Sequence, residues 1–182
     1  DVTPFYIYNP LVARRISASF PRAKIISNLR NPIDRAYSNY ILMHQEGDTT
    51  KTFEEMIQIA MDEIEKNKAK LNDEVYIADT FYQNILARGF YADQLKIWFE
   101  KFQKQQILII PSEDLAQKPD QVLTKVFEFL DLPYFKIKDF TRQNKREYHP
   151  MKDETRKLLV EFYKPHNKKL FDMLGSKFDW DK

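Results

Sequence analysis

Hydrophobic and polar positions along the chain follow two periods, one typical of buried strands and one typical of helices. Short apolar runs rich in β-branched residues at 23–29 and 107–110 predict two parallel strands that are buried on both faces. Apolar residues at helical spacing predict helices over residues 10–20, 32–43, 53–67, 77–86, 91–102, 118–130 and 153–166. Strands that alternate with helices indicate an α/β fold, with a parallel sheet between two layers of helices.

Local signals place several of these boundaries. We expect Asn31 as an N-cap with Pro32 at the first helical position, and Thr52 with Glu55 as a capping box. The inward faces of the last two helices are expected to carry Val122, Val126, Phe127 and Leu130, and then Leu158, Leu159 and Phe162. Residues 131–150 show no periodicity and combine aromatic with basic side chains, which is typical of a functional connection.

The composition limits the possible partners. A chain of 182 residues with 43% hydrophobic content fits one domain over residues 1–182. Its 29 basic and 27 acidic residues nearly cancel, so no bulk charge attracts nucleic acid or an anionic membrane. No apolar run approaches the roughly 20 residues of a membrane span. The lack of cysteine excludes disulfides and fits a cytoplasmic, reducing compartment, while a Golgi lumen would require a longer chain with an N-terminal anchor.

The beginning of the sequence and its glycine content both suggest a missing element. The chain opens at Asp1 without methionine and runs at once into aromatic and apolar residues, as the interior of a protein does, so we expect a fragment or a processed form. It contains only Gly47, Gly89 and Gly175, too scattered for a glycine-rich phosphate loop. Any such loop is expected to lie outside these residues.

A candidate anion site follows the first predicted strand. Arg30 stands at the carboxyl end of that strand, and Ser38 lies in the first turns of the next helix. Open parallel sheets bind ligands at this end of their strands, where helix N-termini attract anions, and a guanidinium suits phosphate. Spacing alone leaves an alternative open, in which Arg30 pairs with Asp34 and Ser38 faces a neighbouring turn.

Residues 24–38 read K-I-I-S-N-L-R-N-P-I-D-R-A-Y-S and closely resemble the 3′-phosphate-binding segment of sulfotransferases that use 3′-phosphoadenosine 5′-phosphosulfate (PAPS). The family pattern is an apolar strand followed by R-x-P-x-D-R-A-x-S. The resemblance implies that Arg30 and Ser38 hold the 3′-phosphate, while Asp34 and Arg35 brace the turn.

Three further segments extend the resemblance over nearly the whole chain. Residues 86–95 are similar to the family's R-G-x-Y-x-x-Q-L, and residues 107–115 to its strand ending in S-E-D-L, although Pro111 is unusual there. Residues 144–148, with Thr155-Arg156 and His166-Asn167, resemble the heparan N-sulfotransferase-like and bacterial branch, in which a basic loop closes over the nucleotide. This implies that Lys145 and Arg146 lie near the donor's phosphate, although Glu147 stands where relatives often carry a second lysine.

The resemblance also implies a fold and a reaction. The fold is the P-loop NTPase-like sulfotransferase fold, and its N-terminal strand and 5′-phosphosulfate loop are absent from this sequence. We therefore expect the chain to be the larger, C-terminal part of the domain and to be inactive alone. The implied reaction moves a sulfuryl group from PAPS to a hydroxyl or amine and releases adenosine 3′,5′-bisphosphate (PAP). The acceptor is open: a small molecule, a carbohydrate, a lipid, a tyrosine or a carrier-bound group.

Two alternatives to this reaction remain. One is a catalytically inactive module that only binds PAP or another nucleotide. The other is a nucleotide kinase-like phosphotransferase, which would need a Walker lysine and Mg²⁺.

Other residues with possible chemistry have simpler interpretations. His44 is a candidate catalytic base, but a histidine at a helix end is more often a surface or capping residue. His149 and His166 are equally open, and without regularly spaced ligands we predict no metal. Tyr91 is kept as a candidate nucleotide contact, although Tyr91 and Trp98 at this spacing are more often core. Glu113 and Asp114 are expected on an extended strand with opposite orientations, and therefore to be structural.

Overall fold

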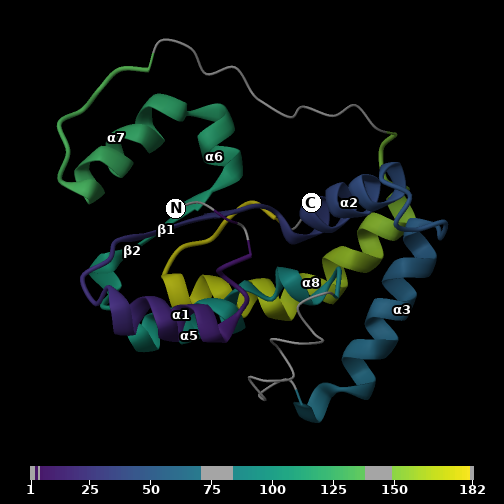
Figure 1. The fold of residues 1–182 in the computed structure, drawn as a ribbon. Coiled ribbons are helices and arrows are strands. Elements are labelled where there is room, and N and C mark those ends of the chain that lie inside the picture. Colours follow the sequence, from purple (N-terminus) through teal and green to yellow (C-terminus); the bar gives the residue numbers. More distant parts are fainter. Residues whose placement is uncertain (1–2, 4, 71–83, 138–148, 181–182) are drawn as a thin grey trace.

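The computed structural model describes residues 3, 5–70, 84–137 and 149–180 (Figure 1). Strands β1 (Ile25–Leu29) and β2 (Ile107–Pro111) pair in parallel, in a register that runs from Ile25 beside Ile107 to Leu29 beside Pro111. The helices are α1 (Pro10–Ser19), α2 (Pro32–Gln45), α3 (Phe53–Lys66), α5 (Tyr91–Lys101), α6 (Ser112–Gln117), α7 (Pro119–Leu130) and α8 (Asp153–Leu174). Short 3₁₀ turns cover η1 (Lys68–Lys70), η3 (Ala87–Gly89) and η4 (Lys104–Gln106). The predicted α/β fold with a parallel sheet flanked by helices is confirmed.

Helices lie on both sides of the two strands (Figure 1). Helices α1, α5 and α8 lie on one side, and α6 and α7 lie on the other. Leu29 packs with Leu95, Leu170 and Trp180 in a dry layer, and Ile107 packs with Ala13, Trp98 and Phe102 beside it. The sheet face that contacts α1, α5 and α8 is therefore the well-covered one.

The predicted helix starts are confirmed where local chemistry defines them. The Asn31 side chain accepts from the Ile33 N–H at 2.9 Å, and Pro32 occupies the first helical position. At α3, the Thr52 hydroxyl accepts from the Glu55 N–H at 3.3 Å, while the Glu55 carboxylate accepts from the Thr52 N–H at 2.7 Å. Each cap satisfies amide groups that the first helical turn leaves without partners.

The predicted burial of β1 and of two helices is wrong in part. Ile26 of β1 is 40% exposed, so the strand is not buried on both faces within the described part of the chain. In α7, Val122 alone of the four expected residues is fully buried, because the helix contacts the partly open face. In α8, Leu158 is 50% exposed, while Leu159, about 100° around the helix, is buried.

Two predicted boundaries are also wrong. Residues 112–117 form helix α6, so Glu113 and Asp114 occupy a first helical turn rather than an extended strand. Helix α8 does not end near residue 166 but continues through Pro165 to Leu174. Pro165 cannot donate a hydrogen bond to the Glu161 carbonyl, but both residues are exposed to solvent. Buried residues of α8 lie on both sides of the proline, so packing continues through it. Most of the helix predicted over 77–86 lies outside the described residues, as does residue range 138–148 of the basic connection.

Candidate functional site

The candidate site is the turn that joins β1 to α2. Arg30 follows the last residue of β1, and Asn31 caps the helix that begins at Pro32. The turn therefore joins the carboxyl end of a parallel strand to the amino end of a helix, where partly positive backbone amides favour an anion. The structure places Arg30 half-buried at this position, as the sequence predicts.

Hydrogen bonds from three other segments hold this turn. The Tyr91 hydroxyl of α5 donates to the Arg30 carbonyl at 2.9 Å. The Asn31 N–H donates to Glu113 Oε1 of α6 at 2.9 Å, and Asn31 Nδ2 donates to the Trp180 carbonyl at 3.3 Å. The Trp180 indole N–H donates to Glu113 Oε2 at 3.3 Å. The backbone around Arg30 is thereby fixed while its side chain stays partly exposed.

Close packing under the turn adds a steric constraint. A Cβ atom on Gly89 would lie 2.8 Å from Pro32 Cβ and 2.8 Å from Tyr163 Cε1, closer than such atoms approach in folded proteins. The Tyr163 hydroxyl donates to the Leu86 carbonyl at 2.7 Å, and burial raises the pKa of this tyrosine well above its usual range. Only glycine fits between α2 and α8 at this point.

Ser38 is the seventh residue of α2 and is half-buried. At a rise of about 1.5 Å per residue it lies roughly 10 Å along the helix from the Asn31 cap. Within the described part of the chain its hydroxyl makes no hydrogen bond. The structure thus places the predicted cation and hydroxyl on the same strand-turn-helix unit, with the hydroxyl available.

The D-R pair of the segment makes contacts within the protein. The Asp34 carboxylate accepts from Arg156 Nη2 of α8 at 2.6 Å, and the Arg35 guanidinium donates to the Ile85 carbonyl. These contacts connect α2 to α8 and to the segment before α5. That the pair braces the turn itself and does not touch the donor stays a prediction.

Tyr91 and Trp98 are core residues, the interpretation that their spacing favoured. Both rings are buried, and the Trp98 indole donates to the Ile7 carbonyl at 3.0 Å. Burial raises the pKa of Tyr91 above its ordinary value, so the hydroxyl remains a donor to Arg30 at neutral pH. A direct contact between Tyr91 and a nucleotide stays a prediction.

The three histidines lie in different surroundings. His44 is exposed in the last turn of α2, with its ring 5.8 Å from that of Tyr40, and its role as a base stays a prediction. His149 is exposed, and its carbonyl accepts from the Tyr37 hydroxyl at 2.9 Å. His166 stacks on Phe90 with ring centroids 3.7 Å apart, and burial lowers its pKa. Lys145 and Arg146 lie outside the described residues, and their predicted contact with the donor stays a prediction.

Glu113 is the residue at this turn whose contact the sequence did not reveal. The sequence predicts an extended strand here, whereas Glu113 lies in the first turn of α6 and its carboxylate contacts both Asn31 and Trp180. One available signal was the acidic pair directly after Ser112, because carboxylates are favoured in the first turn of a helix.

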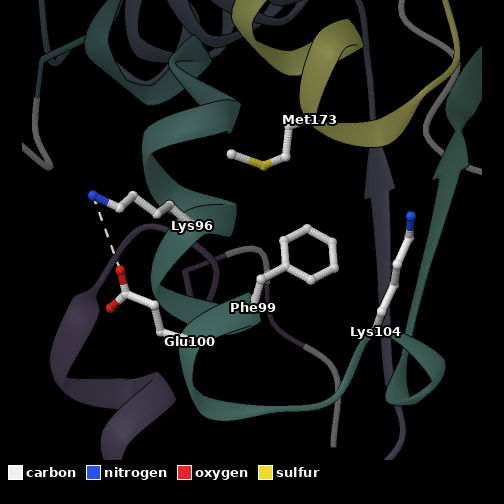
Figure 2. Close-up of a pocket in the computed structure, with 5 residues that line it drawn as sticks. All are labelled: Lys96, Phe99, Glu100, Lys104 and Met173. Carbon is white, nitrogen blue, oxygen red and sulfur yellow. Dashed lines mark ion pairs between the residues drawn. The ribbon is translucent and has the colours of Figure 1, made fainter.

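One pocket lies away from the turn, beside the amino end of β2 (Figure 2). It has a volume of about 390 Å³ and is lined by Lys96, Phe99, Glu100, Lys104 and Met173. Figure 2 shows Phe99 and Met173 between the Lys96–Glu100 ion pair on one side and Lys104 on the other. A smaller pocket of about 170 Å³ lies between α2 and α3, where Arg88 Nη1 donates to Asn39 Oδ1 at 2.9 Å.

The described ranges contain neither a cluster of metal-ligating side chains nor a membrane-spanning helix. No group of three or more His, Cys, Asp or Glu side chains there gathers closely enough to hold a metal ion. No helix in those ranges has the length and apolar character needed to cross a membrane.

Several known sulfotransferases are similar to this chain in sequence. The chain is 27% identical, over 99% of its length, to the membrane-associated sulfotransferase kil1 of Dictyostelium discoideum, of which it covers 52%. It is 30% identical, over 91% of its length, to human carbohydrate sulfotransferase 15, of which it covers 32%. It is 31% identical, over 75% of its length, to the bifunctional heparan sulfate N-deacetylase/N-sulfotransferase 1 of Caenorhabditis briggsae, of which it covers 16%. The chain thus spans about half or less of these relatives.

A solved structure gives the same result for the fold. The sulfotransferase from Alicyclobacillus acidocaldarius superimposes with a TM-score of 0.77 at 26% identity, over 98% of this chain and 65% of that chain. The sulfotransferase domain family matches residues 8–181, which include the turn at Arg30, helix α2 and the Tyr91 segment. The chain belongs to the sulfotransferase domain family.

Proposed function

We propose that this protein transfers a sulfuryl group from PAPS to a hydroxyl or amine of a carbohydrate acceptor and releases PAP. Arg30 and Ser38 would hold the 3′-phosphate of the donor. The observation that carries the proposal is the braced turn after β1, which presents a half-buried arginine at the carboxyl end of a parallel strand. Membership of the sulfotransferase domain family favours this reaction over a kinase-like phosphotransfer.

Each residue of the turn contributes a separate interaction with the phosphate. The Arg30 guanidinium offers two parallel N–H donors and a charge that persists at all physiological pH values. The Ser38 hydroxyl offers a neutral donor from the side of α2, and the amino end of α2 adds partly positive amides. Lys145 and Arg146 would add charge from the connection before α8.

Binding at the 3′-phosphate would fix the donor for an in-line displacement. The acceptor oxygen or nitrogen forms a bond to sulfur, the bond from sulfur to the bridging oxygen of the 5′-phosphate breaks, and PAP leaves with those electrons. A base takes the acceptor's proton, and His44 is the candidate that the sequence offers. Positioning and charge neutralisation supply most of the rate gain in such transfers.

The names of two relatives support a carbohydrate acceptor. Carbohydrate sulfotransferase 15 and the heparan sulfate N-sulfotransferase are named for sugar acceptors, which offer hydroxyl and amine groups respectively. For the compartment, the cytoplasm is proposed from the absence of cysteine, and fractionation of expressing cells tests it.

The experiment is calorimetric titration with PAP of three proteins: the wild type, Arg30→Ala and Arg22→Ala. Arg22 is an exposed arginine before the amino end of β1, so its removal changes the net charge equally. We expect Arg30→Ala to weaken PAP binding by about 1.5–3 kcal/mol, the usual worth of a charge-assisted hydrogen bond, and Arg22→Ala to leave it unchanged. Equal affinity in all three proteins would remove Arg30 from the site.

A second assay measures transfer of labelled sulfate from PAPS to sugars with free hydroxyl or amino groups. Transfer to a sugar supports the proposed reaction. Tight PAP binding without transfer to any class of acceptor would favour the nucleotide-binding module instead.

A further inference from the structure

Glu113 lies beside the Arg30–Asn31 turn, the proposed nucleotide turn, because of the strand register. Strands β1 and β2 pair in parallel up to Leu29 beside Pro111, so the residues that follow each strand are also neighbours. The chain after β1 turns into α2, and the chain after β2 turns at once into α6. The first turn of α6 therefore carries Glu113 to the backbone of Asn31.

Both carboxylate oxygens of Glu113 accept hydrogen bonds from neutral donors. Oε1 accepts from the Asn31 N–H at 2.9 Å, and Oε2 accepts from the Trp180 indole N–H at 3.3 Å. A carboxylate has two acceptor oxygens, whereas an amide of the same shape has one oxygen and one NH₂ group. With glutamine at this position, the side-chain NH₂ group would face one of the two N–H donors, and that hydrogen bond would be lost.

Glu113 and Tyr91 act on a single peptide unit. The Arg30 carbonyl, which accepts from the Tyr91 hydroxyl, and the Asn31 N–H, which donates to Glu113, belong to the same planar amide group. A peptide plane held at its oxygen and at its hydrogen cannot rotate without breaking one of these bonds. Its orientation sets the direction in which the Arg30 side chain leaves the backbone.

We infer that Glu113 is a positioning residue for the donor's 3′-phosphate, since it fixes the peptide unit that aims Arg30. This inference rests on the proposed function. Glu113 touches neither donor nor acceptor in this role; it acts through Asn31, and the Trp180 indole holds the carboxylate in place. Helix α6 thereby couples the end of β2 to the nucleotide turn at the end of β1.

An electrostatic role for Glu113 would have the opposite consequence. A carboxylate this close to the turn repels a bound phosphate, so removal of its charge alone would strengthen PAP binding. Positioning requires that the same change weaken binding, because the freed peptide unit lets Arg30 leave its place. The direction of the change therefore separates the two roles.

The test compares Glu113→Gln with Asp114→Asn in the whole protein. Asp114 is the neighbouring, exposed carboxylate in the same helical turn, so both variants lose one negative charge near the amino end of α6. Affinity is measured for PAP and for 5′-AMP, which differs from PAP by the 3′-phosphate alone. We expect Glu113→Gln to lose about tenfold in PAP affinity with little change for 5′-AMP, and Asp114→Asn to match the wild type for both.

A second variant keeps the test decisive if Glu113→Gln folds poorly. Trp180→Phe removes the indole N–H but keeps an aromatic ring, and a smaller loss of about two- to fourfold, again confined to PAP, is expected. The inference is overturned if PAP affinity is unchanged or higher in Glu113→Gln, or if PAP and 5′-AMP affinities fall together. A wild-type protein that fails to bind PAP at all would instead overturn the proposed function.

Discussion

The two ends of the parallel strands are built very differently. At the carboxyl end, the Arg30–Asn31 turn is held by hydrogen bonds from Tyr91, Glu113 and Trp180. At the amino end, the chain leading into β1 is held by Gln106, whose Nε2 donates to the Pro21 and Ala23 carbonyls at 2.9 and 3.0 Å. The preceding Phe20 is 66% exposed there.

The difference shows at which end of the strands hydrogen bonds from several distant segments fix the backbone. The larger of the two pockets lies at the amino end and is lined by two lysines, a glutamate, a phenylalanine and a methionine (Figure 2). The carboxyl end has a half-buried arginine on a backbone that several segments immobilise. Phosphate recognition requires a fixed direction of approach more than it requires volume, since each lost degree of freedom otherwise opposes binding.

The largest effect on this contrast is expected from Gly89→Ala. The new methyl group would meet Pro32 and Tyr163 at 2.8 Å and push α2 away from α8, so we expect a loss of about 1–3 kcal/mol in the free energy of unfolding. For a chain of this length that is a fall of roughly 3–10 °C in Tm, measured by thermal melting.

Gly47→Asn is the control for this substitution. Gly47 has a φ of 78°, which asparagine tolerates, and open space around its Cα. A Tm of Gly89→Ala equal to that of the control would show that the carboxyl end is less tightly built than described.

A smaller effect is expected from Gln106→Ala at the amino end. Loss of its bonds to the Pro21 and Ala23 carbonyls should cost about 0.5–1.5 kcal/mol, while PAP affinity stays unchanged because the nucleotide turn lies at the other end of β1. The neighbouring, exposed Gln105→Ala is the matched control. Weaker PAP binding in Gln106→Ala would mean that the two ends of the strands are coupled, which would contradict the contrast drawn between them.

The smallest effect is a pH dependence that arises from His166 in α8. Burial against Phe90 lowers the pKa of His166. Below about pH 6.5, His166 is therefore protonated more readily in the unfolded chain than in the folded chain. The stability is full above that pH and falls as the pH drops toward the lowered folded-state value. His166→Phe keeps a stacked ring and should lose less stability than the wild type between pH 7.5 and 5.5 in chemical denaturation.

His44→Phe serves as the control because His44 is exposed on α2. If the wild type and His166→Phe lose stability in parallel with falling pH, His166 does not titrate as its burial requires.

The features that the sequence predicts correctly depend on residues that are close together in the sequence. The Asn31 cap, the Thr52–Glu55 capping box and both strands follow from short patterns of polarity and turn chemistry. The candidate anion site at Arg30 and Ser38 follows from such a pattern together with the family resemblance, and both the site and its ligand stay a proposal. Local chemistry was sufficient to find the turn.

The missed features depend on contacts between distant segments. The sequence does not predict helix α6, because β2 ends at Pro111 directly before it and the alternation typical of a strand continues into Glu113. Leu158 was assigned to the core because an isolated helix does not show which of two adjacent leucines meets α2 and α3. The bond from Asn31 to Glu113 joins residues 82 positions apart, and no local pattern encodes it.

The bonds around Asn31 have a consequence for the order of folding. They join residues 61, 82 and 149 positions apart in the chain, so each closes a long loop whose entropy must be lost first. During synthesis, β1 and α2 are made before Trp180, so the NH₂ group of the Asn31 side chain gains its acceptor only after Trp180 has been synthesised. We therefore expect the Arg30–Asn31 turn to be among the last parts of the domain to become rigid, after the strands and helices around it have formed.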